Sequence, residues 1–167
     1  IGAGRAARAV SGTDGLPGFV TFDMGGTSSD VSLIRDGDAE RTTDTTIDGI
    51  PIRTPMVDIN TIGSGGGSIA WVDSGGALRV GPRSAGADPG PACYGNGGTE
   101  PTVTDANVVL GYVGESTTLG GELSVDVAAA ETTLENLADE AGLESARAAA
   151  RGVYRVANAK MTRAIRE

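Results

Sequence analysis

Several residue types that build common active sites are missing, or nearly missing, from this sequence. Its 167 residues include no histidine and a single cysteine, Cys93. Without imidazole this segment cannot supply a histidine-dependent catalytic triad or zinc site, and one cysteine cannot form an internal disulfide. Any metal bound here must be a hard cation held by oxygen, and Mg²⁺ is the expected one. A lone cysteine also indicates a reducing cytoplasm as the expected compartment.

Long apolar runs are absent as well. No run approaches the roughly 20 residues that a membrane-spanning helix needs, so no membrane contact is expected. The first residues, Ile1–Arg8, include neither an initiator methionine nor the apolar stretch of a signal peptide. We therefore expect the chain to be an internal piece of a longer protein.

Lysine is scarce in this sequence. Lys160 is the only lysine among its 13 basic residues. The 22 acidic residues bring the net charge to -9, which repels nucleic-acid phosphates, so no nucleic acid is expected as a partner. A lysine-poor, aspartate-rich composition is typical of cytoplasmic proteins of salt-loving microbes, in which high salt screens self-repulsion. The alternative is an acidic protein from a GC-rich bacterium that is not a halophile.

The order of the apolar segments predicts one α/β (α+β) domain over residues 1–167, with strands first and helices last. Short apolar or alternating runs predict strands at 18–23, 30–34, 41–47, 56–62, 69–73 and 77–80. Turns are expected at Asp36–Gly37 and Gly75–Gly76. Residues 81–101, dense in glycine and proline, predict an ordered loop without regular structure.

Helices are predicted by capping residues and by apolar spacing. Residues 2–10 have the pattern of a helix end, and residues 102–105 can cap a short helix through Tyr112. Asp126 and Gly142 bracket a helix over 127–141. Ser145 can cap a final helix that runs to the end of the chain.

The densest chemical signal lies in Phe22–Ser32. An acidic residue, Asp23, ends a predicted strand, and the glycines Gly25 and Gly26 are followed by hydroxyl side chains. Glycines that adopt positive φ would let successive N–H groups converge on a phosphate, while Asp23 could hold Mg²⁺ directly or through water. A plain hairpin turn closed by two glycines is the alternative interpretation.

A second glycine cluster occupies Gly63–Ser68. Four glycines in six residues are costly unless close backbone approach is required, and free N–H groups there would make an anion site. No lysine follows the glycines, so the segment is not a P-loop, and its spacing does not match a Rossmann fingerprint. A flexible hinge is the competing hypothesis.

Three long signatures then resemble the hydantoinase A/oxoprolinase family, whose members include N-methylhydantoinase, 5-oxoprolinase and the beta subunit of acetone carboxylase. The first is Phe22–Val31, which is similar to the family's second phosphate motif. The second is Asp58–Ala70, and the third runs from Val80 to Gly95 and on through Pro101–Asn107. These signatures stand in the right order and cover most of residues 18–112.

The resemblance implies an actin-like, ribonuclease-H-like ATPase fold with a mixed sheet, in which two lobes clamp Mg-ATP. Residues 18–47 would begin the second lobe, and residues 81–101 would be a family-specific insertion. ATP would activate a cyclic amide or a carbonyl oxygen by phosphorylation. The partners implied are a small cyclic-amide substrate, the remaining lobes of the same chain and a hydantoinase B-type subunit.

Candidate site residues follow from the motifs and the resemblance. The candidate catalytic residues are Asp23, Asp30, Asn60 and Arg83, and Asp23 is also the candidate metal ligand. The candidate cofactor-binding residues are Gly25, Gly26, Thr27, Ser28, Gly63, Gly65, Gly66 and Gly67. Many relatives carry histidine where this chain has Asn60, and asparagine cannot shuttle a proton near neutral pH.

Other polar residues admit two interpretations each. Arg83 could clamp a phosphate or form an ordinary loop salt bridge. Asp88 and Asp105 could contact a metal or substrate, while turn formation and helix capping also explain them. Cys93 has no base nearby in the sequence, which favours a buried structural thiol.

Three functions remain compatible with the sequence. The first is part of an ATP-dependent cyclic-amide hydrolase. The second is part of an ATP-dependent carboxylase subunit, and the third is a non-catalytic module of the same ATPase fold. The sequence does not separate the first two, because the substrate pocket is expected largely outside this segment.

Overall fold

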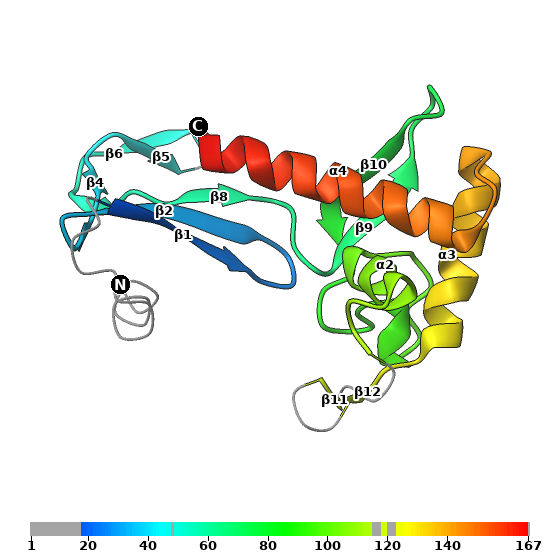
Figure 1. The fold of residues 1–167 in the computed structure, drawn as a ribbon. Coiled ribbons are helices and arrows are strands. Elements are labelled where there is room, and N and C mark those ends of the chain that lie inside the picture. Colours follow the sequence, from blue (N-terminus) through cyan, green and yellow to red (C-terminus); the bar gives the residue numbers. More distant parts are fainter. Residues whose placement is uncertain (1–17, 48, 115–117, 120–122, 167) are drawn as a thin grey trace. The chain divides into compact units, whose positions relative to one another are not determined.

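The computed structural model describes residues 18–47, 49–114, 118–119 and 123–166 (Figure 1). Within this part the chain forms two compact units. The first takes the residues up to Asp23 together with Asp30–Thr61, and the second takes Met24–Ser29 together with the residues from Ile62 onward. The helix expected at residues 2–10 lies outside the described residues.

The first unit is built on strand β2 (Ser29–Arg35), which pairs with β1 (Gly18–Met24), with β3 (Asp38–Ala39) and with β8 (Asn60–Ile62). Val31 and Ile34 on β2 are buried. The β2–β3 connection turns at Asp36–Gly37, where both residues have positive φ. The strands predicted at 18–23 and 30–34 and the turn at 36–37 are therefore confirmed.

The prediction of a single strand at 41–47 is wrong. Two short strands, β4 (Arg41–Thr42) and β5 (Thr45–Ile47), pair with β7 (Met56–Val57) and β6 (Ile50–Ile52), respectively. The run breaks because the N–H of Asp44 donates to Oγ1 of Thr42 over 3.1 Å, a local turn that competes with strand pairing. The run predicted at 56–62 is likewise divided between β7 and β8.

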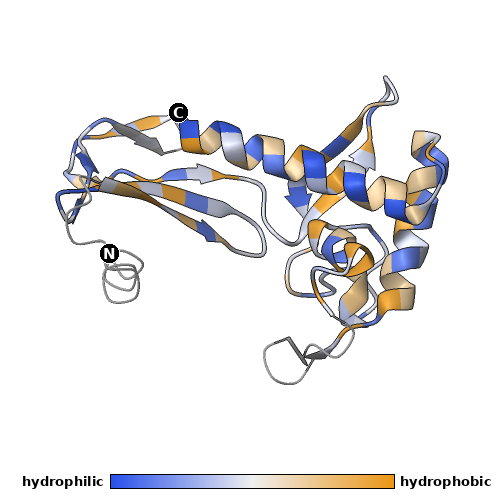
Figure 2. Cartoon of the chain, viewed as in Figure 1, coloured by the Kyte–Doolittle hydropathy of each residue, from blue (hydrophilic) through white to orange (hydrophobic). Residues whose placement is uncertain are grey.

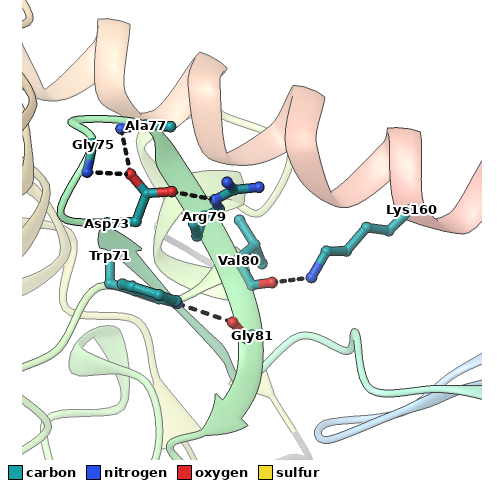
Figure 3. A network of polar contacts seen from close by, with 8 residues as sticks. All are labelled: Trp71, Asp73, Gly75, Ala77, Arg79, Val80, Gly81 and Lys160. Carbon is teal, nitrogen blue, oxygen red and sulfur yellow. Dashed lines mark hydrogen bonds and ion pairs between the residues drawn. The ribbon is translucent and has the colours of Figure 1, made fainter.

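The second unit contains the hairpin of β9 (Ser68–Val72) and β10 (Leu78–Ser84), as predicted, with Val80 opposite Ala70. At its tip one Asp73 oxygen accepts the N–H groups of Gly75 and Ala77, at 3.0 and 2.9 Å, and the other accepts Nε of Arg79 at 2.7 Å (Figure 3). The Ala77 N–H and the Arg79 side chain lower the pKa of the Asp73 carboxyl. The aspartate therefore fixes the turn while it remains ionised.

Three helices follow the hairpin: α2 (Val103–Leu110), α3 (Val127–Ala141) and α4 (Ala146–Arg166). Asp126 caps α3 at its start, and Gly142, with φ 65°, ends it. Ser145 accepts the N–H of Ala148 at the start of α4. All three predicted helices are confirmed, and α2, with Thr102 as its N-cap, ends at Leu110, two residues before the expected end at Tyr112.

The core of this unit is made of small and branched apolar side chains from the hairpin and the three helices. Leu134 on α3, Val153 on α4 and Val80 on β10 are fully buried in it. Alanine dominates the buried face of α4, which lets the helix approach its neighbours closely. Hydrophobic and hydrophilic residues alternate along α4, as its amphipathic pattern predicted (Figure 2).

Two carbonyl oxygens of β10 accept side-chain donors from other elements (Figure 3). Nε1 of Trp71 donates to the Gly81 oxygen at 2.9 Å, and Nζ of Lys160 on α4 donates to the Val80 oxygen. The expectation of a loop without regular structure at 81–101 is wrong at two points. Strand β10 continues to Ser84, and a short 3₁₀ helix, η1, spans Ala92–Tyr94. The α/β (α+β) architecture with C-terminal helices is confirmed.

Candidate functional site

The glycine turn at the tip of the β1–β2 hairpin, Gly25–Ser28, is the first part of the candidate site. The N–H of Gly25 donates to the carbonyl oxygen of Ser28 over 2.8 Å and closes the turn. Gly25, Gly26 and Thr27 are exposed. The expectation that these glycines adopt positive φ is wrong, since neither belongs to the described glycines with positive φ.

The backbone of this turn contacts the second glycine cluster. The N–H groups of Gly66 and Gly67 donate to the carbonyl oxygens of Gly25 and Gly26, over 2.9 and 2.6 Å. A Cβ atom on Gly65 would lie 2.6 Å from the Gly25 oxygen and 2.7 Å from the Gly26 oxygen. The two glycine segments therefore touch through bare backbone, which no larger residue at Gly65 permits.

Hydrogen bonds of buried serine hydroxyl groups stabilise the second glycine cluster. Oγ of Ser29 donates to the carbonyl oxygen of Ser64 at 2.6 Å, and the N–H of Gly65 donates to Oγ of Ser68 at 2.8 Å. All three serines are buried. Oγ of Ser64 has no hydrogen-bond partner within the described part of the chain. These serines were not among the predicted site residues, although their position beside the glycines was a usable signal.

The cluster is also tied to the elements that flank it. The N–H and Oγ1 of Thr104 on α2 both donate to the carbonyl oxygen of Gly66, at 2.8 and 2.9 Å. The N–H of Ala85 donates to the oxygen of Gly67 at 2.8 Å. Hydrogen bonds to residues on both sides of this cluster indicate an ordered turn and not a flexible hinge.

These bonds decide which way the peptide groups of the first turn point. In a trans peptide the C=O and the following N–H point in opposite directions. Because the oxygens of Gly25 and Gly26 face the second cluster, the N–H groups of Gly26 and Thr27 face away from it. Within the described part of the chain neither N–H has a protein acceptor.

The second cluster has fewer free N–H donors for an anion than its sequence suggested. The N–H groups of Gly65, Gly66 and Gly67 all donate within the chain in this conformation. A Cβ atom on Gly63 would lie no closer than 4.0 Å to its nearest neighbour, Pro82, so that position has room. Contact between this cluster and a phosphate stays a prediction.

The candidate catalytic residues of the first unit lie on neighbouring strands. Asp23 is exposed on β1. Asp30 on β2 accepts Oγ1 of Thr61 at 2.6 Å, and Asn60 lies beside Thr61 on β8, which pairs with β2. Asp30 and Asn60 therefore come from paired strands, while their proposed chemical roles stay predictions.

Arg83 and Asp105 have structural partners. Nη2 of Arg83 lies 2.8 Å from Oε1 of Glu100 in an exposed ion pair, which is the ordinary salt bridge considered above. Asp105 is fully buried and forms a capping box with Thr102 at the start of α2. Its carboxylate also accepts the N–H groups of Cys93 and Ala92, at 2.8 and 3.3 Å. Helix capping thus accounts for Asp105.

Cys93 is buried, as expected of a structural thiol. Burial, followed by the negative charge of Asp105, raises the pKa of its thiol well above the usual range. The described residues contain no cluster of three or more histidine, cysteine, aspartate or glutamate side chains suited to a metal ion. Over the same residues, no helix has the length and apolarity needed to cross a membrane.

The hydantoinase/oxoprolinase family model matches residues 2–167, nearly the whole chain. The chain belongs to this family. Caprolactamase subunit alpha from Pseudomonas jessenii is 43% identical over 163 residues, which is 97% of this chain and 23% of that protein. 5-oxoprolinase 1 from Arabidopsis thaliana is 43% identical over 165 residues, covering 89% of this chain and 13% of that one.

Solved structures of family members have the same fold. The crystal structure of the ATP-dependent caprolactamase from Pseudomonas jessenii matches 98% of this chain and 24% of its own, with 43% identity and a TM-score of 0.84. The nucleotide-free structure of acetone carboxylase matches 99% of this chain and 23% of its own, with 29% identity and the same TM-score. This family member thus spans about a quarter, or less, of the length of these relatives.

Proposed function

We propose that this family member supplies part of the ATP-binding machinery of an ATP-dependent cyclic-amide hydrolase of the N-methylhydantoinase/5-oxoprolinase type. The observation that carries the proposal is the pair of consecutive N–H groups at Gly26 and Thr27. Both lie on an exposed turn, both point away from the second glycine cluster, and neither has a protein acceptor in the described chain. Adjacent backbone donors of this kind suit phosphate oxygens.

The turn also has room for an anion. A Cβ atom built on Gly26 would meet nothing within 4 Å, so a ligand can approach the backbone there. Thr27 and Ser28 add hydroxyl groups to the two N–H donors. In this proposal the second cluster, Gly63–Gly67, supports the turn and completes the phosphate-binding surface.

Asp23 is the proposed magnesium ligand. Mg²⁺ in nucleotide sites keeps several waters and is held by one or two carboxylates together with phosphate oxygens. A single exposed carboxylate two residues before the glycine turn fits that requirement, and a cluster of three carboxylates is not needed. Asp30, Asn60 and Arg83 are proposed to contact the substrate or the transferred phosphoryl group.

The substrate class rests on family membership. Caprolactamase and 5-oxoprolinase are both named after cyclic amides, and both are 43% identical to this chain. In such a reaction ATP would supply a phosphoryl group that converts the amide oxygen into a better leaving group. The remaining lobes of the protein and a partner subunit would supply the rest of the site, in the cytoplasm.

A carboxylase subunit is the second candidate. The match to acetone carboxylase has the same TM-score, 0.84, as the match to caprolactamase, but its sequence identity is lower, at 29% against 43%. A non-catalytic ATPase module is a third possibility. Assaying ATP hydrolysis by the complete protein with hydantoin, 5-oxoproline, caprolactam and acetone plus bicarbonate separates the three.

The decisive experiment on the site is Asp23→Ala in the complete protein. Loss of the magnesium ligand should lower ATP turnover by about a hundredfold or more, while the melting temperature stays unchanged. Asp38→Ala, which removes another exposed carboxylate from the same sheet, is the matched control and should retain activity. Full turnover in Asp23→Ala would remove the proposed role.

A further inference from the structure

Two contacts set the register of the hairpin that strands β1 and β2 form. Next to the turn, the N–H of Gly25 donates to the carbonyl oxygen of Ser28 at 2.8 Å. Farther from the turn, Oγ1 of Thr21 lies 2.7 Å from Oγ of Ser32 and donates to the carbonyl oxygen of Ser32 at 3.2 Å. The two contacts are the same number of residues apart on both sides of the hairpin, so the strands pair residue for residue between them.

Asp23 on β1 and Asp30 on β2 lie midway between these contacts and face each other across the hairpin. Side chains two residues apart on a strand share a face, so both carboxylates lie on the face that carries Thr21 and Ser32. Residues directly opposite each other in an antiparallel pair have Cβ atoms about 4.5–5.5 Å apart. Both aspartates are exposed. The candidate magnesium ligand and a second candidate catalytic residue are therefore direct neighbours.

Asp30 is also bonded to strand β8. This strand pairs with β2, and Oγ1 of Thr61 on β8 donates to Oδ1 of Asp30 at 2.6 Å (Figure 1). Among the described residues, Oδ2 of Asp30 has no hydrogen-bond partner. Because Thr61 is exposed, water could satisfy its hydroxyl group, and burial does not force the bond to Asp30. Asp23, Asp30 and Thr61 thus form a row across three neighbouring strands.

The bond between Thr61 and Asp30 lies close in sequence to both glycine segments. Asp30 comes two residues after Ser28, where the first turn ends, and Thr61 comes two residues before Gly63, where the second cluster begins. An aspartate side chain without a partner rotates among staggered orientations, whereas a short bond to a donor on a neighbouring strand selects one of them. The Asp30 carboxylate is therefore presented in a fixed orientation beside Asp23.

We propose that Thr61 is a positioning residue of the ATP site, because its hydroxyl group fixes the Asp30 carboxylate for contact with the reacting groups. The inference rests on the proposed function, in which Asp30 contacts the substrate or the transferred phosphoryl group. Thr61 uses one carboxylate oxygen, and the other stays available to a hydrogen-bond donor of the bound ligand. A group whose orientation is fixed before the substrate arrives raises the rate of the chemical step. An ordinary cross-strand contact would contribute to stability alone.

The test is a double-mutant cycle on Thr61 and Asp30 in the complete protein. ATP hydrolysis is measured with whichever of hydantoin, 5-oxoproline, caprolactam, or acetone plus bicarbonate supports turnover. Thr61→Val keeps the branched shape that suits a strand but removes the donor. It should lower kcat about tenfold and leave KM for ATP within about twofold, with an unchanged melting temperature. Thr61→Ser, which keeps the hydroxyl group, should retain most of the rate. In the Asp30→Ala background Thr61→Val should lower the rate no further, because its effect passes through Asp30.

Two further measurements separate positioning from a structural role. Thr46→Val, at an exposed threonine of strand β5, is the matched control and should keep full activity. A crystal structure of the complete Thr61→Val protein should show the Asp30 carboxylate in more than one orientation, which is a readout independent of turnover.

The outcomes distinguish this inference from the proposed function. The positioning role alone is overturned if Asp30→Ala slows ATP hydrolysis but Thr61→Val does not, or if the two effects add. It is also overturned if Thr61→Ser is as slow as Thr61→Val, because the hydroxyl group would then not be what Asp30 needs. If Asp30→Ala leaves turnover unchanged, the proposed role of Asp30 is wrong and the role of Thr61 is overturned with it.

Discussion

The N–H of Gly66 donates to the carbonyl oxygen of Gly25 over 2.9 Å, and this bond joins two glycine-rich turns that are far apart in the sequence. With the parallel bond from Gly67 to Gly26, it orients two peptide planes of the first turn. The N–H groups of Gly26 and Thr27 consequently face outward. One glycine segment thus positions the other, and the glycines of the second cluster permit this close backbone contact without adopting positive φ.

Gly65→Ala tests this positioning. The added Cβ would lie 2.6 Å from the Gly25 oxygen and 2.7 Å from the Gly26 oxygen, so the two turns must move apart. We expect a loss of about 1–3 kcal/mol in the free energy of unfolding, together with reduced ATP turnover in the complete protein. Urea unfolding and a coupled ATPase assay measure the two effects.

Gly63→Ala is the control for that variant. Its nearest neighbour would be the Pro82 side chain at 4.0 Å, so the free energy of unfolding should stay close to that of the unmodified protein. Equal behaviour of the two alanine variants would contradict the contact between the turns.

Asp105→Asn should destabilise the second unit. The buried carboxylate accepts from the N–H groups of Thr102, Cys93 and Ala92 and from Oγ1 of Thr102, and an amide leaves some of these donors unpaired. We expect a loss of about 2–4 kcal/mol, seen as a lower thermal midpoint. Asp139→Asn on the exposed face of α3 should change the midpoint little. An unchanged thermal midpoint in Asp105→Asn would show that these hydrogen bonds contribute little to the stability of the second unit.

Cys93 should resist alkylation in the folded protein. Burial and the Asp105 charge raise the pKa of its thiol, so the reactive thiolate is scarce at pH 8, and access is blocked as well. Labelling with a thiol reagent should occur at the rate of unfolding and become immediate in concentrated urea. Fast labelling without denaturant would show that this region opens more readily than its burial indicates.

Stability should rise with salt into the molar range. The net charge of -9 implies self-repulsion, and screening shortens its reach to about 3 Å at 1 M salt. Thermal midpoints in a KCl series give the answer. A midpoint that stays flat or falls would favour the merely acidic protein over the halophile hypothesis.

Much of the local structure could be predicted because it depends on neighbours in the sequence. The limits of α3 follow from Asp126 and Gly142, and the β9–β10 hairpin follows from alternation around Gly75–Gly76. Such caps and turns act over one or two turns of backbone, so residue type alone specifies them. The single strand expected at 41–47 does not form, and the reason is again local. The Asp44 N–H donates to Oγ1 of Thr42, and strand propensities take no account of such a side-chain hydrogen bond.

The sequence by itself determined where the glycine clusters lie, how acidic the chain is and which helices form. Only the tertiary structure decided that the N–H groups of the second cluster are used within the chain, and that Gly26 and Thr27 present theirs outward. It also decided that Thr61, just before the second cluster, donates to Asp30, just after the first turn. Residue type specifies that a donor or a charge exists, but its partner is set by which distant segment packs against it, and no local pattern records that packing.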